Sequence, residues 1–195
     1  YICEIHAEVK RLLFLLPLLA GCSEQPSVPK PYGFHRIELP ASRNYQKFSA
    51  ASCPFTFEYP AIGKIQNQSQ NDCWIDIYFP QFDCKWHITY KNLQTEKIEA
   101  ARLYEEYRSI VYKHSQKARD IQQKQEIYPA GNATFYEIYG NVPTSAQFYL
   151  TNRTKDKAIM TSFYFNTAMK NDSLAPVIDY MKTDLKHLLK TIEWK

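Results

Sequence analysis

The fold is constrained most strongly by a series of short segments in which apolar and polar residues alternate. The clearest examples are "CPFTFEYP" (53–60), "CWIDIYFP" (73–80) and "CKWHITYK" (84–91). Successive side chains of a β-strand point to opposite faces of a sheet, so each segment would bury one face and leave the other in water. A sheet with one solvated face is typical of antiparallel pairing. The other segments read as strands are 34–39, 133–140, 145–152 and 158–166.

Two further segments have the three- or four-residue spacing of an amphipathic helix. The first spans about 95–125, and the second spans about 174–192, with Asp172 and Ser173 at its capping positions. The order is four strands, a helix, three strands and a helix. It predicts a single α+β domain over residues 34–195, with one antiparallel sheet of about six to seven strands and two amphipathic helices packed on it.

The N-terminal region has the pattern of a secretory signal. Two cations, Lys10 and Arg11, precede an apolar run over 12–19 that contains one proline. This run would span roughly 12 Å as a helix, which is too short to cross a bilayer. The "LAGC" that ends at Cys22 resembles the bacterial lipobox, in which the cysteine is acylated and the chain is cut just before it. We therefore expect a signal peptide over residues 1–21 and a lipid bilayer anchor at Cys22.

Two short segments beside this signal are not expected to belong to the folded domain. Residues 1–8 carry two acidic residues and no methionine, so we expect them to lie upstream of the true translation start at Val9. Residues 22–33 are polar and rich in proline, and we expect them to form an extended tether between the lipid and the domain.

Charge and motif content argue against nucleic-acid binding and against catalysis. The formal net charge is +4, but basic and acidic residues are interspersed, so we expect no nucleic-acid partner. The chain has no G-x-S-x-G, G-x-G-x-x-G, P-loop or C-x-x-C motif, and its histidines lack the spacing of a helical zinc pair. Asp72, Asp76 and Asp83 could converge on a cation, but acids at the rim of a sheet are usually solvated. We therefore expect no catalytic residue, no metal and no cofactor.

The residue pattern favours a docking surface for another protein. Its predicted members combine aromatic and charged side chains at positions expected on the solvated face: Glu58, Trp74, Asp76, Tyr78 and His87. Tryptophan and tyrosine are enriched among the residues that dominate binding energy. For Trp74 the alternative is burial beneath the second helix.

Four strings occur in order along the mature chain: "PKPYGFHRIELP" (29–40), "YGNVPTSAQFYLT" (139–151), "NDSLAPVIDY" (171–180) and "HLLKTIEWK" (187–195). Together they resemble the gliding motility lipoprotein family GldD of Bacteroidota. The resemblance implies a lipoprotein that is anchored through Cys22, faces the periplasm and is required for gliding and the associated type IX secretion machinery. It implies other proteins of that machinery as partners and no established active site.

Three cysteines, Cys53, Cys73 and Cys84, remain after lipidation, and an oxidising periplasm favours a disulfide. All three begin predicted strands on the apolar face, so local geometry leaves the three possible pairings open. The family resemblance implies the pair Cys53–Cys73. Cys84 would then be a buried free thiol that behaves as a small hydrophobic residue.

Two shorter resemblances bear on modification and on an alternative function. The "DSL" at 172–174 is similar to an O-glycosylation motif of secreted Bacteroidota proteins, which makes Ser173 a candidate modification site beside its capping role. The "FTFEYP" at 55–60 resembles the opening of the PsbP/Mog1-like α+β fold. The alternative function is therefore a periplasmic PsbP-like lipoprotein that binds a small ligand or a client protein, and a third is an unrecognised hydrolase.

Overall fold

The computed structural model describes residues 37–68, 73–166 and 171–195, which all lie in the compact unit from Arg36 to Lys195. The strands of this part are β1 (Tyr45–Ser49), β2 (Phe55–Pro60), β3 (Lys64–Gln68), β4 (Ile75–Phe79), β5 (Cys84–Asn92), β6 (Ala118–Tyr128), β7 (Gly131–Gly140), β8 (Thr144–Thr151), β9 (Lys157–Phe165) and β10 (Glu193–Trp194). The helices are α2 (Leu93–Glu96), α3 (Ala100–Tyr112), the 3-10 turn η2 (Lys113–Gln116) and α4 (Asn171–Thr191).

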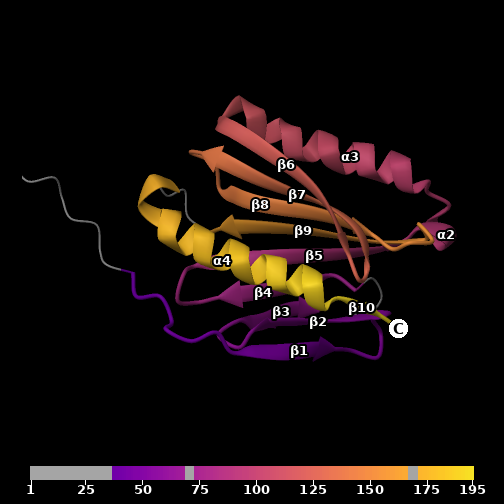
Figure 1. The fold of residues 1–195 in the computed structure, drawn as a ribbon, viewed down its shortest axis with the longest axis horizontal. Coiled ribbons are helices and arrows are strands. Elements are labelled where there is room, and N and C mark those ends of the chain that lie inside the picture. The colour runs from indigo at the N-terminus through magenta and orange to yellow at the C-terminus, as the bar shows by residue number, and fades with distance from the viewer. Residues whose placement is uncertain (1–36, 69–72, 167–170) are drawn as a thin grey trace, which may run out of the picture. The chain divides into compact units, whose positions relative to one another are not determined.

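The described strands form two sheets (Figure 1). The larger has seven strands in the order β3-β4-β5-β9-β8-β7-β6, and the smaller has the order β1-β2-β10. Every pair of neighbours runs antiparallel. The α+β class and the antiparallel pairing expected from the sequence are therefore confirmed, although the strands are divided between two sheets instead of forming one.

The main hydrophobic core lies on one face of the larger sheet. Alternate residues of its strands, such as Ile77, Trp86 and Phe163, are fully buried there. Leu185 of α4 and Phe57 of β2 belong to the same buried cluster, so α4 and the smaller sheet close this face. Each large side chain buried in this way contributes about 1.5–3 kcal/mol, which makes this core the main source of stability.

The helix α3 covers part of the opposite face. Its buried residues Leu103, Tyr107 and Val111 are four positions apart and form one stripe. They pack in a second cluster with Tyr136 of β7 and Tyr149 of β8. This cluster includes no described residue of β4 or β5, so the corresponding face of those two strands lies outside it.

The helix predicted over about 95–125 is wrong in its second half. The helix α3 ends at Tyr112, η2 follows, and the chain continues as the strand β6. The register of β6 with β7 runs from Ala118 opposite Gly140 to Tyr128 opposite Gly131. Pairing with β7 thus supplies the backbone hydrogen bonds of this segment and overrides a local spacing that also suits a helix.

Other boundaries also differ from those expected. Residues 37–39, the described part of the predicted first strand, lie outside any strand, and the first strand is β1. The strands β1, β3 and β10 were not predicted. The helix α4 begins at Asn171, which places Asp172 and Ser173 in its first turn and not at the capping position.

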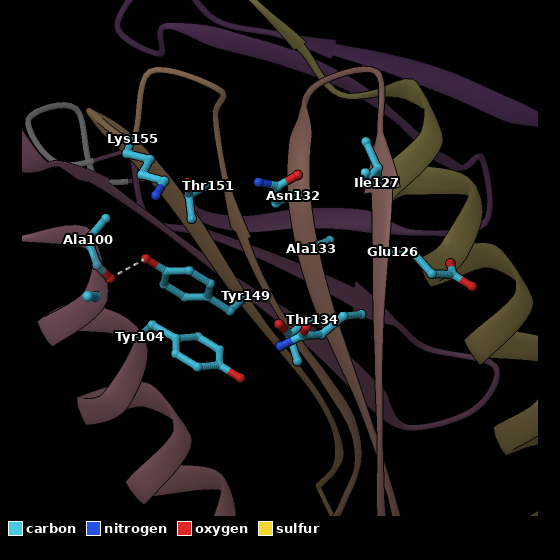
Figure 2. Close-up of a pocket in the computed structure, with 12 residues that line it drawn as sticks. Ala100, Tyr104, Glu126, Ile127, Asn132, Ala133, Thr134, Tyr149, Thr151 and Lys155 are labelled. Carbon is cyan, nitrogen blue, oxygen red and sulfur yellow. Dashed lines mark hydrogen bonds between the residues drawn. The ribbon is translucent and has the colours of Figure 1, made fainter.

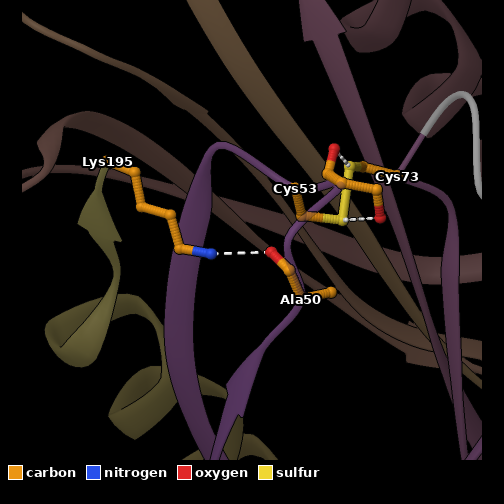
Figure 3. The surroundings of a disulfide bond; sticks show 5 residues. Ala50, Cys53, Cys73 and Lys195 are labelled. Carbon is orange, nitrogen blue, oxygen red and sulfur yellow. Dashed lines mark hydrogen bonds between the residues drawn. A yellow bond between two sulfur atoms is a disulfide. The ribbon is translucent and has the colours of Figure 1, made fainter.

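A disulfide joins Cys53 and Cys73, whose Cα atoms are 5.5 Å apart (Figure 3). The two cysteines precede β2 and β4, and these strands belong to different sheets. The disulfide therefore connects the two sheets. The pairing is the one that the family resemblance implies, and Cys84 is a buried free cysteine.

Replacing Cys53 and Cys73 together by alanine is expected to lower the free energy of unfolding by about 3 kcal/mol, because the bond joins residues 20 apart in the sequence. Urea denaturation measures this loss, and the wild type unfolded in a reducing agent should match the variant.

Burial raises the pKa of the Cys84 thiol, so an alkylating reagent should modify it only after denaturation. A bridge to Cys84 in a non-reducing peptide map would contradict this pairing.

Candidate functional site

Four of the five residues predicted for the docking surface lie close together on the neighbouring strands β4 and β5 or just before β4. Asp76 and Tyr78 alternate with the buried residues of β4, and His87 of β5 is the cross-strand partner of Asp76. Trp74, just before β4, is 44% exposed, so it is not part of the core beneath α4. We call the surface formed by Trp74, Asp76, Tyr78, Lys85 and His87 the β4–β5 face.

Hydrogen bonds fix the orientation of several side chains on the β4–β5 face. His87 Nδ1 lies 2.5 Å from Asp76 Oδ1, and His87 Nε2 lies 3.2 Å from Thr89 Oγ1. The Tyr78 hydroxyl donates to Asp83 Oδ1 at 3.1 Å, and this hydrogen bond raises the pKa of Tyr78. Side chains that are already held in one orientation lose less conformational entropy when a partner binds.

Asp76 contacts His87, and His87 contacts Thr89. A carboxylate, an imidazole and a hydroxyl in this order also make up a general-base relay. A relay needs in addition a substrate cleft and donors for a developing oxyanion. Here the His87 side chain is 42% exposed on a sheet surface, and the pocket described below lies on another part of the sheet. Within the described residues, no group of three or more His, Cys, Asp and Glu could hold a metal ion. Asp76, His87 and Thr89 thus lie on an open sheet surface and do not line the pocket.

Glu58 lies apart from the β4–β5 face. It belongs to β2 of the smaller sheet, and its Oε2 lies 2.7 Å from His187 Nε2 of α4. The ring of His187 stacks on Tyr45 of β1 with the ring centroids 3.7 Å apart. The placement of Glu58 on the predicted docking surface is therefore corrected. Alternation puts Glu58 on a solvated face, but it does not reveal to which sheet that face belongs.

A pocket of about 470 Å³ opens between α3 and the strands β6 to β8 (Figure 2). Tyr104 of α3 and Tyr149 of β8 form an aromatic wall, with their ring centroids 5.4 Å apart. Ile127, near the end of β6, and Lys155, in the turn between β8 and β9, lie on opposite sides of it. Sequence reasoning missed this pocket because its walls come from segments far apart in the chain, one of which was predicted as helix.

The two tyrosines of the aromatic wall are held in place by hydrogen bonds. The Tyr149 hydroxyl donates to the Ala100 carbonyl oxygen at 3.1 Å, and the Tyr104 hydroxyl accepts from Tyr136 at 3.2 Å. Burial raises the pKa of Tyr149 to about 12, so this hydroxyl is neutral at ordinary pH. The wall is thus rigid, uncharged and mostly apolar.

The comparisons with known proteins identify a family. The model of the family described as gliding motility lipoprotein GldD matches residues 24–194. This chain belongs to the GldD family of gliding motility lipoproteins. The family predicted from the sequence is confirmed, and the GldD match includes both sheets. No curated protein matches the chain at a significant level.

Two solved structures are similar to this GldD-family chain. The cyanobacterial PsbP protein CyanoP from Synechocystis sp. PCC 6803 is 14% identical, with 79% of this chain and 94% of that chain covered and a TM-score of 0.48. The Ran-binding protein Mog1p of Saccharomyces cerevisiae is 8% identical, with 78% and 96% covered and a TM-score of 0.49. PsbP and Mog1 are the proteins named from the sequence for this fold.

Some residues predicted for a GldD-family lipoprotein lie outside the described part of the chain. These are the signal peptide, the acylated Cys22, the tether and Asp72, together with the side chain of Ser173. In the part that is described, no helix combines the length and the apolar character that a membrane span requires.

Proposed function

We propose that this chain is a non-catalytic component of the gliding motility and type IX secretion machinery, anchored by acylated Cys22 and facing the periplasm. Membership of the GldD family supports the motility role, and the lipobox-like "LAGC" supports the anchor. The chain would act by binding another protein of the machinery through the β4–β5 face.

The observation that carries this docking proposal is the exposure of Trp74 beside the fixed pair of Asp76 and His87. An exposed indole offers a large apolar area, and truncating such a residue in an interface can cost 2 kcal/mol or more of binding energy. Lys85, whose Nζ lies 5.9 Å from the centroid of the Tyr78 ring, adds a cation to the same surface. The surface thus combines an aromatic anchor with charged groups that can select a partner.

Replacing Trp74 by alanine is expected to abolish colony spreading when the variant complements a deletion strain, while the melting temperature stays unchanged. The reason is that Trp74 is exposed and contributes little to the core. Tyr112 of α3, which is 38% exposed, provides the matched control, because Tyr112→Ala should leave spreading intact. A Trp74→Ala variant that spreads normally, or one that unfolds, would contradict the docking role.

Replacing Cys22 by alanine is expected to leave the protein soluble or unprocessed, because the acyl chains are lost. Each buried CH₂ group of an acyl chain contributes about 0.8 kcal/mol, so a protein with two or more chains should not leave the membrane measurably. Cell fractionation and labelling with radioactive palmitate measure the effect. A variant that still sediments with membranes and incorporates palmitate would overturn the assignment of Cys22.

A deletion strain also separates this proposal from the ligand-binding alternative. Loss of spreading together with loss of secreted cargo is expected for a component of the machinery. A growth defect that a single nutrient cures would instead support a periplasmic ligand-binding protein. Crosslinking at the β4–β5 face followed by purification would then identify the protein that docks there.

A further inference from the structure

The pocket beside α3 has features that the docking proposal does not use. Its volume of about 470 Å³ is that of a site for a small molecule, and it opens on the face of the sheet that α3 covers in part. Tyr104 and Tyr149 form a wall that is held in place before any ligand arrives. Figure 2 shows the two rings facing the space between α3 and the strands.

Ile127, at the rim of the pocket, is exposed to an unusual degree. Its side chain is 82% exposed, the highest value among the exposed large hydrophobic residues of the described part. The neighbouring positions Gln123 and Gln125 on the same face of β6 are polar, as expected for an edge strand that pairs only with β7 among the described strands. Ile127 thus places an apolar side chain at the rim of the pocket, where the body of a ligand can contact it.

Lys155 supplies a cation to the pocket. Its backbone has a φ of 57°, in the left-handed region, and Figure 2 shows its side chain directed toward Thr151 on the pocket floor. Lys155 has no ion pair with any described residue. Glu126, the acidic residue that lines the pocket, is already bound by Lys124 and by the Tyr128 hydroxyl. The charge of Lys155 is therefore left for a ligand.

The floor of the pocket can form hydrogen bonds. Asn132 and Thr134 of β7 and Thr151 of β8 line it, and they alternate with residues that face the main core. An aromatic wall whose two rings meet edge to face, polar groups on the floor and one cation at the side together suit an aromatic molecule with an anionic group. A simple aliphatic chain would leave the floor and the cation unpaired, and a neutral aromatic molecule would leave the cation unpaired.

We propose that this pocket binds a small aromatic carboxylate, with the ring against Tyr104 and Tyr149 and the carboxylate at Lys155. The apolar body of the ligand contacts Ile127 at the rim of the pocket. This site is independent of the β4–β5 face, so either proposal can fail without the other.

The test uses NMR of the full chain in detergent micelles. It follows the amide resonances of the protein, because partition of a ligand into the micelle then does not register as binding. The titrants are 2-naphthoate and its neutral analogue 2-naphthamide, which have nearly the same shape. We expect saturable shifts at Tyr104, Thr134 and Tyr149 with 2-naphthoate, and about tenfold weaker binding of 2-naphthamide. Equal affinity for the two compounds, or shifts that lie mainly elsewhere, would overturn the proposal.

Two pairs of variants separate the cation from the cavity. Lys155→Asn removes the charge and keeps a residue that tolerates the left-handed backbone, so 2-naphthoate should bind about tenfold more weakly while 2-naphthamide is unaffected. Lys97→Asn is its control, because Lys97 has a φ of 55° and lies outside the pocket. Ala101→Trp should fill the cavity and abolish binding of both compounds, whereas Ser109→Trp, on the same helix but outside the pocket, should not. Binding that survives Ala101→Trp would overturn the assignment of the pocket.

Discussion

Replacing Glu137 by alanine is expected to lower the free energy of unfolding by about 3 to 5 kcal/mol. Glu137 lies on β7 and faces α4, where its Oε2 accepts hydrogen bonds from Lys182 at 2.8 Å and from the Tyr139 hydroxyl at 2.7 Å. Its Oε1 accepts from Lys186 at 3.1 Å. The Lys182 side chain is only 6% exposed, so loss of the carboxylate leaves a buried ammonium group without its counter-charge.

Urea denaturation at neutral pH measures this loss, and an exposed ion pair provides the control. Arg102 Nε and Glu106 Oε1 form an ion pair at 3.0 Å on the surface of α3, and both side chains are more than half exposed. Glu106→Ala should therefore change the free energy of unfolding by less than about 0.5 kcal/mol. A similarly small effect of Glu137→Ala would contradict this prediction, because water or a rearranged side chain would then compensate the charge of Lys182.

The same residue gives the stability a defined pH dependence. Burial alone would raise the pKa of Glu137, but hydrogen bonds from Lys182, Tyr139 and Lys186 outweigh it and lower the pKa from 4.5 to about 2. A carboxylate whose pKa is lower in the folded state stabilises the fold fully above its unfolded pKa and loses this contribution as pH falls through the folded pKa. The difference between the wild type and Glu137→Ala should therefore be complete above pH 4.5 and shrink progressively toward pH 2.

The strands that were predicted correctly from the sequence are strands that bury at least one face. In β4 and in the first five residues of β5, every second residue is buried in the core while its neighbours are partly exposed, so the alternation is visible in the sequence itself. The strand β6 has no such contrast, since most of its residues are exposed and only Tyr128 is buried. Its strand character comes from pairing with β7, and no local pattern in β6 records that pairing.

The candidate surface was predicted to the extent that it depends on alternation within one hairpin. Asp76, Tyr78 and His87 share a face because β4 and β5 are neighbours in the sequence and in the sheet. The assignment of Glu58 failed because β2 pairs with β1 and β10, and the strand β10 comes from the other end of the chain. The pocket could not be predicted either, since it requires α3 to be placed over strands that follow it in the sequence.

Among the described glycines, the one at which a substitution should be most harmful is Gly131, the first residue of β7 after the β6–β7 turn. Gly131 pairs with Tyr128, so only Pro129 and Ala130 separate the two strands. Its φ is +149°, which residues with a side chain rarely adopt, and an added Cβ would lie 1.9 Å from the Thr151 carbonyl oxygen and 2.8 Å from Asn152 Cα. Both neighbours are backbone atoms of β8 and the following turn, and they cannot rotate away.

Gly131→Ala is therefore expected to destabilise the protein by about 3 kcal/mol or more, which corresponds to a fall in melting temperature of roughly 6–12 °C. The sign is informative, because the same exchange at an unstrained position usually stabilises a protein by about 0.4–1 kcal/mol through the unfolded chain. Asn132→Ala, at the next and exposed position, should shift the melting temperature by no more than about 2 °C. A Gly131→Ala variant as stable as the wild type would mean that the β6–β7 turn and Thr151 do not approach each other as closely as described.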